Sequence, residues 1–367
     1  MEAAEEKKLR RGYTTGACAA AATKAALTAL ITKEEQPEAT ILLPVGEFAT
    51  FSMEECLFAE ESVLAGTVKD GGDDPDATHG ALIQSQVSWH PGQGIILDGG
   101  LGVGRVTKPG LPVPVGEAAI NPVPRKMILE AAKEVLGRFG VQRGIKIIIS
   151  VPMGEELAKK TLNGRLGIIG GISILGTRGT VIPFSTSAYK ASIVSAINVA
   201  KVSGCDHVVI TTGGRSEKYA MQQYPFLPEE AFIEMGDFVG FTLKQCKRAG
   251  MKKVSMVGMM GKFSKVAQGV MMVHSKSAPV DFEFLAELAR AAGAPSELAE
   301  KVIEANTASQ VGEMMMEEGL SGFFEQMCRS CCLSGLEEIK GGMTIETSIY
   351  TMKGSLLGKA AIDGESY

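Results

Sequence analysis

The stretch His207-Val208-Val209-Ile210-Thr211-Thr212-Gly213-Gly214-Arg215-Ser216 decides the fold of this chain, because an unbroken aliphatic run leads directly into a paired-glycine turn. Continuous aliphatic residues are typical of strands that are buried on both faces of a parallel sheet. Similar runs alternate with amphipathic helices over the middle third of the sequence. We therefore predict a doubly wound, three-layer α/β domain with a mainly parallel sheet, whose ligands bind beyond the carboxyl ends of the strands.

Glycine-containing turns follow three of the predicted strands, and we expect them at one edge of the sheet: residues 170–177, 211–216 and 258–262. Beyond the second turn, Glu234 ends the next predicted strand, 21 residues after Gly213. In nucleotide sites an acid about 20 residues beyond the glycines binds a ribose hydroxyl; Asp237 is a near alternative. The pattern predicts an adenosine-type ligand. The alternative is that the glycines only turn strands into helices.

The loop KDGGDDPDATHG, residues 69–80, holds four aspartates, three glycines and a histidine directly after a predicted strand at 63–68. Mutual repulsion makes such a concentration of carboxylates costly, which favours a functional site. Its glycines let a ligand approach the main chain closely. The alternative is a solvated acidic turn organised by Asx-type hydrogen bonds.

Near the amino terminus, an alanine-rich helix is predicted over residues 17–31, with Thr14 or Thr15 as its N-cap. A helix start that is preceded by hydroxyls and a glycine can hold an anionic group. The alternative is a capped helix whose small residues allow close packing.

The length of 367 residues exceeds the roughly 250–300 at which single cores stop growing, so we expect two domains. The first is a layered α+β domain at 1–142 that carries the acidic loop, and the second is the α/β domain at 143–280 with its glycine-rich turns. Residues 281–367 are predicted as a helical region that packs on the rest, with a closing strand at 343–350.

Composition excludes several classes of protein. The net charge of −5 and the lack of long Lys/Arg runs argue against nucleic-acid binding. We expect no membrane segment, since no apolar run approaches the roughly 18 residues that a span needs, and residues 1–12 lack the apolar core of a signal peptide. Seven scattered cysteines indicate reduced thiols in the cytoplasm. We expect no metal at Cys328, Cys331 and Cys332, because no fourth ligand lies near them in sequence.

Four motifs, in this order along the chain, resemble the CbiD family: GYTTGACAAAA at 12–22, residues 69–80, RLGIIGGISILGTRG at 165–179 and ITTGGRSEKYA at 210–220. The resemblance implies a C-methyltransferase of anaerobic cobalamin biosynthesis. In that reaction S-adenosylmethionine methylates C1 of a cobalt-containing tetrapyrrole, cobalt-precorrin-5B, to give cobalt-precorrin-6A. It implies two domains, with cobalt present only in the substrate. One departure is Asn163-Gly164-Arg165, where the family pattern has Asn-Pro-Arg.

Such a reaction needs donor and acceptor held nearly in line more than it needs elaborate acid–base machinery. S-adenosylmethionine is then expected on the glycine-rich turns, with an acid on its ribose: Gly171, Gly176, Thr177, Gly213, Gly214 and either Glu234 or Asp237. The carboxylates around the rim of the substrate are expected on hydroxyls and cations: Thr14, Thr15, Gly16, Arg178, Arg215 and Lys218.

Three roles are open for the acidic loop under this resemblance. Its aspartates face the positive sulfonium and amino group of the donor, or Asp70 or His79 moves a proton at the macrocycle, or the aspartates only organise the loop. The expected catalytic residues are Asp70, His79 and Asp73.

Other classes of protein remain open on the residues alone. A nicotinamide-dependent oxidoreductase uses the same turns and acid. A divalent-metal enzyme would use the loop aspartates as hard oxygen ligands: Asp70, Asp73, Asp74 and Asp76. A non-enzymatic interaction protein is disfavoured, because the polar, glycine-rich turns form two loop systems and no broad apolar face. Assembly into a homo-oligomer is left open.

Overall fold

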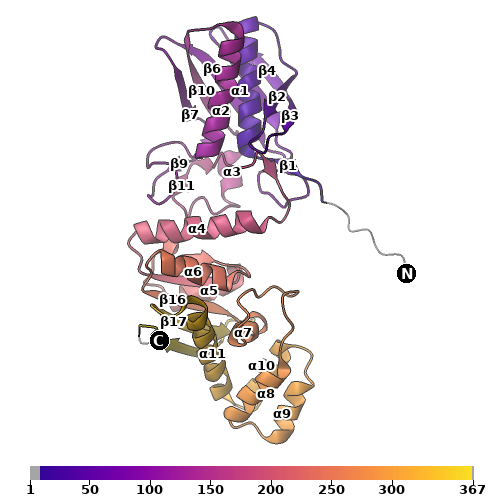
Figure 1. Cartoon of the computed structure of the whole chain (residues 1–367), viewed down its shortest axis with the longest axis vertical. Helices are drawn as coiled ribbons and strands as arrows, with labels where there is room; N and C mark the ends of the chain where they lie inside the picture. The colour runs from indigo at the N-terminus through magenta and orange to yellow at the C-terminus, as the bar shows by residue number, and fades with distance from the viewer. Residues whose placement is uncertain (1–8, 366–367) are drawn as a thin grey trace, which may run out of the picture. The chain divides into compact units, whose positions relative to one another are not determined.

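The computed structural model describes residues 9–365, and most of the segment 1–12, from which the expectation about a signal peptide was drawn, lies outside this range. The chain forms two compact units, which meet in sequence at Thr186 and Ser187 (Figure 1). Each unit has a main sheet of five strands and a large apolar core of its own.

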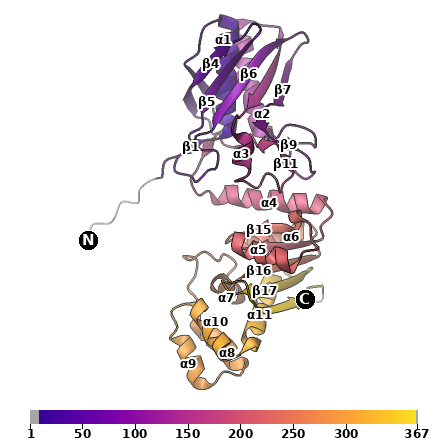
Figure 2. The same ribbon diagram turned by 180° about the vertical axis from the view of Figure 1, so that it is seen from behind.

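Unit 1 contains a mixed sheet in the order β4-β5-β6-β10-β7, in which the β10–β7 pair is parallel and the other pairs are antiparallel. In chain order these strands are β4 Glu55–Phe58, β5 Ser62–Val68, β6 Leu82–His90, β7 Ile95–Gly99 and β10 Gly144–Ser150. Two long helices, α1 Thr15–Thr32 and α2 Pro122–Phe139, share one core with this sheet. Figure 2 shows the sheet of this unit in front of the helices.

Helix α1 confirms the predicted alanine-rich helix and its cap, since the Thr14 side chain accepts a hydrogen bond from the amide of Ala17. By length and composition α1 could cross a membrane, but 78% of that window is buried inside the structure, as in a core helix. Its small side chains let α2 approach closely, and a Cβ added at Gly16 would come within 2.7 Å of Pro124. The hairpin of β2 (Glu38–Leu42) and β3 (Phe48–Ser52) also packs on α1.

Three further pairs of strands in the described part of unit 1 are each only two residues long. These are β1 Gly12–Tyr13 with β13 Thr180–Val181, β9 Arg105–Val106 with β11 Ile168–Ile169, and β8 Gly102–Val103 with β12 Gly171–Ile172. Helix α3, Gly154–Ala158, lies among them in sequence. The run RLGIIGGISIL at 165–175 contains only the two-residue strands β11 and β12, where the sequence pattern predicts a strand of the parallel sheet before the first glycine turn.

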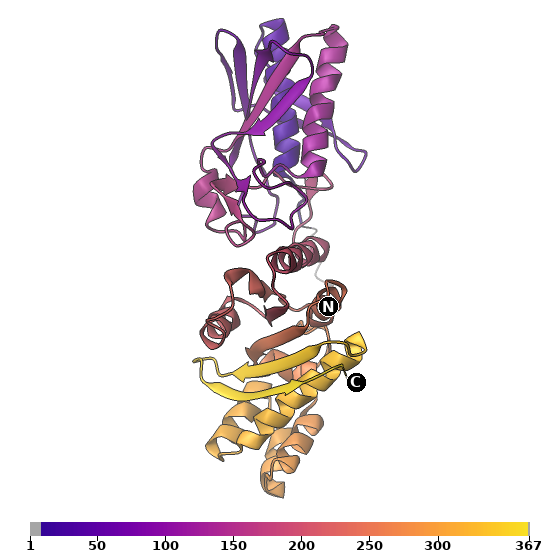
Figure 3. The same cartoon turned by 90° about the vertical axis from the view of Figure 1, so that its left-hand side faces the viewer.

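Unit 2 contains the predicted parallel sheet, in the order β15-β14-β16-β17-β18, with β18 alone antiparallel (Figure 3). Its strands are β14 His207–Thr211, β15 Phe232–Glu234, β16 Lys253–Met259, β17 Thr344–Tyr350 and β18 Leu356–Ile362. Helix α5, Gly214–Gln223, packs on one face. The other face is covered by helices that share one core with the sheet: α4 Thr186–Val202, α6 Val239–Arg248, α7 Met260–Ala267 and α11 Ser321–Ile339. The three-layer prediction is confirmed.

The domain boundaries differ from the predicted ones. The aliphatic strand β10 pairs with β6 and β7, so the boundary predicted at 142–143 moves to Thr186/Ser187. A strand at the centre of a mixed sheet is buried on both faces and therefore has the same apolar pattern as a parallel strand. Residues 281–365 belong to unit 2 as well. The predicted helices α8 Phe282–Ala291, α9 Ser296–Ile303 and α10 Ala308–Glu317 precede α11, and the closing strand β17 joins the main sheet beside β16.

Candidate active site

The strand order of unit 2 creates a crevice between β14 and β16. Numbered by their order along the chain, the strands from β15 to β18 lie in the order 2-1-3-4-5. The chain therefore runs from β14 to β15 on one side and then crosses to β16 on the other side of β14. Ligands of doubly wound sheets bind at this switch point, outside the carboxyl ends of the strands. A cavity of about 470 Å³ lies there, lined by the turn after β14, the start of α7 and residues of two later segments, Ser309 and Met352.

The turn from β14 into α5 is shaped for close approach. Gly213 has φ 155° and ψ 172°, a conformation essentially reserved for glycine. The Ser216 hydroxyl accepts a hydrogen bond from the amide of Thr212 at 3.1 Å and donates one to the carbonyl of Gly213 at 2.8 Å. The first amides of a helix have no partner within the helix. Since Gly214 and Arg215 line the cavity at the start of α5, they offer donors for an anionic or polar ligand.

The structure places the two predicted ribose acids differently. Glu234 ends β15 directly opposite Thr211, and its carboxylate lies 3.9 Å from the position that a Cβ on Gly213 would take. Asp237 instead forms an ion pair with Lys262, with Oδ1 and Nζ 2.9 Å apart. Glu234 is therefore the acid beside the glycine turn.

Lys262 was not among the predicted site residues. It lies in the first turn of α7, lines the cavity, and its ammonium also approaches the carbonyl of Thr212 at 3.4 Å. A cation at the end of the third glycine-containing turn is the sequence signal that could have revealed it. Lys262 links the ends of β14 and β15 to the start of α7 at this edge of the sheet.

Tyr189 on α4 approaches the same strand ends. Its hydroxyl lies 2.8 Å from the position of a Cβ on Gly236, whose φ of 59° also favours glycine. Burial, and then the carboxylates of Glu234 and Asp237, raise the pKa of Tyr189 to about 12. The phenol is therefore neutral at physiological pH and can serve as a hydrogen-bond donor.

The first glycine turn, residues 170–177, is in unit 1, so the three turns do not share an edge of one sheet. A Cβ on Gly171 would lie 2.1 Å from the carbonyl oxygen of Gly102, and one on Gly176 would lie 2.4 Å from Cβ of Thr14. These glycines allow close packing of backbone. Thr177 is exposed beside them. The prediction that all three turns lie at one edge of one sheet is wrong, because a glycine required for packing has the same sequence pattern as one that ends a strand of the parallel sheet. The assignment of Gly171, Gly176 and Thr177 to the donor stays a prediction.

The Thr14–Gly16 helix start is brought together with that same turn. Thr15 is buried, its hydroxyl accepts from the amide of Leu175 at 2.9 Å, and the amide of Gly16 donates to the carbonyl of Leu175 at 3.1 Å. The helix start is thus engaged by the protein itself. Arg178 is exposed next to it, without a hydrogen bond or ion pair to any residue in the range 9–365. The guanidinium donors of Arg178 are therefore available to a ligand.

The acidic loop is tied to the segment before β1. The guanidinium of Arg10 pairs with both oxygens of Asp70, and its amide donates to Asp73 at 2.7 Å. The hydrogen bond from Arg10, followed by that from the amide of Gly72, lowers the pKa of Asp70 to about 2. Asp74 accepts from the amide of Phe184 at 2.8 Å. These carboxylates hold three segments of unit 1 together.

Within the loop, Asp76 pairs with Lys69, whose side chain is only 1% exposed. Asp76 also accepts hydrogen bonds from the amide and hydroxyl of Thr78. His79 is exposed, and its Nδ1 accepts from the amide of Gly71 at 3.0 Å, which leaves the proton of the neutral ring on Nε2. Of the loop side chains proposed for chemistry, Asp70 is held by an ion pair and Asp73 by a backbone amide, whereas the contact of His79 with Asp70 is long, at 3.9 Å. In residues 9–365 no group of three or more His, Cys, Asp or Glu side chains is arranged to hold a metal ion.

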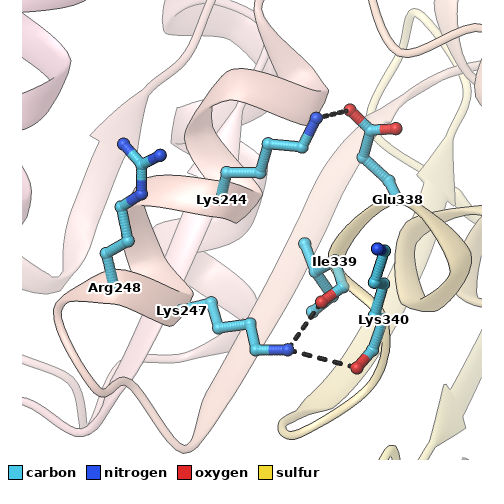
Figure 4. A pocket seen from close by; sticks show the side chains of 6 residues that line it. All are labelled: Lys244, Lys247, Arg248, Glu338, Ile339 and Lys340. Atoms are coloured by element: carbon cyan, nitrogen blue, oxygen red, sulfur yellow. Dashed lines mark hydrogen bonds and ion pairs between the residues drawn. The ribbon is translucent and has the colours of Figure 1, made fainter.

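A second cavity of unit 2, about 400 Å³, is strongly cationic and lies where α6 and α11 end (Figure 4). Lys247 donates to the carbonyls of Ile339 at 2.6 Å and Lys340 at 3.1 Å, and Lys244 pairs with Glu338 at 2.7 Å. The last carbonyls of a helix lack partners and carry partial negative charge, so cations are stabilising there. The lysines of this cavity are therefore explained by the helix ends that they stabilise.

The fold and the switch-point cavity define a two-unit α/β protein that is built to bind a small molecule. Two family models match it: CbiD over residues 2–183, and the CbiD C-terminal domain over residues 272–361. The chain belongs to the CbiD family.

Three relatives show how closely it matches. Proteins named cobalt-precorrin-5B C(1)-methyltransferase are 75% identical in Geobacillus sp. (strain WCH70), with 97% of each chain covered, and 69% identical in Priestia megaterium, with 98% of each covered. One from Rubrobacter xylanophilus is 48% identical over 92% of this chain and 87% of its own. A solved cobalamin biosynthesis protein (cbiD) from Archaeoglobus fulgidus is 27% identical over 85% of each chain, with a TM-score of 0.39. Nothing in these comparisons favours the oxidoreductase or divalent-metal alternatives.

Proposed function

We propose that this protein methylates C1 of cobalt-precorrin-5B, with S-adenosylmethionine as the methyl donor. The observation that carries the proposal is 75% identity over 97% of the chain to a relative with that name. We also propose a cytoplasmic location, in line with seven free thiols.

The switch-point cavity is the proposed site of the donor. Its volume of about 470 Å³ falls in the range of small-molecule sites, about 300–1,000 Å³. Gly213 and Gly214 let adenosine approach the backbone, and Glu234 beside them is placed to accept hydrogen bonds from ribose hydroxyls. When bound there, S-adenosylmethionine supplies an electrophilic methyl group on a sulfonium. The contribution of the chain is to hold that group in line with the acceptor carbon and away from water.

The exposed cations Arg178, Arg215 and Lys218 are proposed to bind carboxylates on the rim of the tetrapyrrole. Arg178 and Lys218 make no ion pair within residues 9–365, so both can accept an anionic partner without losing one.

In the acidic loop we propose separate roles for the three candidates. Asp70 and Asp73 hold the loop, because Arg10 already engages both carboxylates and the pKa of Asp70 is lowered to about 2, which makes it a weak base. His79 is proposed to hold or move a proton at the macrocycle through Nε2, since its Nδ1 is fixed by Gly71.

Calorimetry with S-adenosylhomocysteine tests the donor site. Gly213→Val places a side chain in the turn and is expected to lower the affinity at least about tenfold, whereas Gly137→Val, at an open and exposed position of α2, leaves it unchanged. If Gly213→Val binds S-adenosylhomocysteine with wild-type affinity, the donor does not bind at this turn. Binding of NAD but not of S-adenosylhomocysteine would favour the oxidoreductase instead.

The reaction itself is tested by incubating the purified protein with cobalt-precorrin-5B and S-adenosylmethionine. Mass spectrometry should show the gain of one methyl group by the tetrapyrrole. A tetrapyrrole of unchanged mass would contradict the proposed function.

A further inference from the structure

The side chains that line the switch-point cavity include two cations, Arg215 and Lys262, and no carboxylate. Arg215 is the second residue of α5, and Lys262 is the third residue of α7. A positive charge near the amino end of a helix is opposed by the helix dipole, whereas a negative charge is stabilised there. Two cations at two helix starts around one cavity therefore favour a ligand with an anionic group.

Both cations have unused hydrogen-bonding capacity. The guanidinium of Arg215 has five N–H donors, and its hydrogen bond within residues 9–365 goes to the sulfur of Met352 at 3.5 Å, a weak acceptor. The ammonium of Lys262 has three donors and approaches Asp237 and the carbonyl of Thr212. Its side chain is 40% exposed at the cavity.

Asp237 supplies the complementary negative charge behind this surface. Its Oδ1 is buried, accepts no hydrogen bond of normal geometry from residues 9–365, and has the Lys262 ammonium as its ion-pair partner at 2.9 Å. The Asp237 side chain as a whole is 23% exposed, and a carboxylate can accept more than one hydrogen bond, so a second donor reaches it once Lys262 turns toward a ligand. A cation and an anion side by side match the carboxylate and ammonium of an α-amino acid.

We propose that Lys262 binds the carboxylate at the amino-acid end of the methyl donor, and that Asp237 receives its ammonium. The inference rests on the proposed placement of the donor in this cavity. When the amino-acid end binds, its carboxylate replaces Asp237 as the partner of Lys262, and its ammonium replaces Lys262 as the partner of Asp237. Neither side chain is therefore left without an opposite charge. Lys262 is thus a specificity residue that distinguishes the whole donor from adenosine or a thioether that lacks the amino acid.

The experiment compares two ligands by calorimetry, S-adenosylhomocysteine and 5′-methylthioadenosine, which share the adenosine and the thioether but differ in the amino-acid end. Lys262→Met is expected to weaken S-adenosylhomocysteine about ten- to one-hundredfold, the effect of losing a charge-assisted hydrogen bond, and to leave methylthioadenosine unchanged. Lys262→Arg keeps the charge and should restore most of the affinity. Lys301→Met, which removes an exposed lysine paired at 3.0 Å with Glu297 on α9, is the matched control and should bind both ligands like wild type.

The outcomes separate this inference from the placement of the donor. If wild type binds both ligands and Lys262→Met loses affinity for both equally, Lys262 acts only by holding the turns together, and the inference is overturned. Unchanged affinity for S-adenosylhomocysteine in Lys262→Met overturns it as well. If wild type binds neither ligand, the donor site itself is wrong, and the inference is overturned with it. A thermal melt of each variant, compared with Lys301→Met, identifies any loss that reflects unfolding.

Discussion

Lys69 and Asp76 form an ion pair inside the acidic loop, with 1% of the lysine side chain and 22% of the aspartate side chain exposed. The loop that carries most negative charge in the sequence is thus built around a buried positive one. Its shape depends on that lysine and on Arg10, which neutralises Asp70 from a segment 60 residues away in the chain.

Lys69→Met should destabilise unit 1 by about 3 kcal/mol, because removal of one partner from a buried pair leaves the other charge uncompensated. Lys126→Met, which removes an exposed lysine 3.6 Å from Glu130, should cost about 0–1 kcal/mol. Urea unfolding of both variants measures the difference. Equal losses would show that the buried pair contributes no more than a surface one.

His207 should make stability depend on pH. Burial, then the charge of Lys253, lowers the pKa of His207 to about 4, although Glu346 and Asp206 act in the opposite direction and Lys359 in the same one. The unfolded chain, with an ordinary pKa of about 6.5, takes up the proton first as the pH falls. The stability associated with a neutral His207 is therefore full above about pH 6.5 and is lost toward pH 4.

His207→Gln removes this titration and keeps a partner for Ser255, which lies 2.8 Å from Nε2. Between pH 6.5 and pH 4, the free energy of unfolding of this variant should therefore fall by up to about 3 kcal/mol less than that of wild type. Unfolding free energies across this range provide the measurement. His274→Gln, at an exposed site, should follow the wild-type curve, and a His207→Gln curve parallel to wild type would contradict the prediction.

Gly176→Ala tests whether that glycine serves packing or donor binding. The new methyl group would lie 2.4 Å from Cβ of Thr14, and the φ of 126° is unfavourable for alanine. We expect a loss of about 1–3 kcal/mol in stability, with unchanged affinity for S-adenosylhomocysteine. Gly164→Ala, which meets no atom within 4 Å, is the control and should be near neutral. If the Gly176→Ala protein is folded but binds S-adenosylhomocysteine more weakly, this turn contributes to the donor site.

His79→Gln examines proton transfer at the acidic loop. Glutamine can still accept the hydrogen bond from Gly71, but it lacks an ionisable ring. Turnover of cobalt-precorrin-5B should fall about one-hundredfold, in the range of general acid–base effects, while binding of S-adenosylhomocysteine stays at the wild-type level. His90→Gln is the control histidine. Wild-type turnover in His79→Gln would leave the loop with a purely structural role.

The local sequence pattern predicted those parts of the fold that depend on residues close together in the chain. The strand β14, its glycine turn and helix α5 follow from one continuous run of residues, and the position of Glu234 followed from a known spacing. Contacts between distant segments could not be predicted in this way. The place of β10 depends on which strands flank it, and the partners of Asp70 and Asp76 depend on how the loop packs. The tight packing of Gly171 against Gly102 and of Gly176 against Thr14 also leaves no sign in local sequence.

The position of β10 sets an order for folding during synthesis. This strand inserts between β6 and β7, so the sheet of unit 1 stays incomplete until the ribosome has passed Ser150. Unit 2 receives β17 and β18 only near the end of the chain. Since domains fold as units from the amino terminus during synthesis, a nascent chain that stops before Thr344 would display a finished first unit and a second one whose β16 is still an open edge, the state in which sheets recruit other chains.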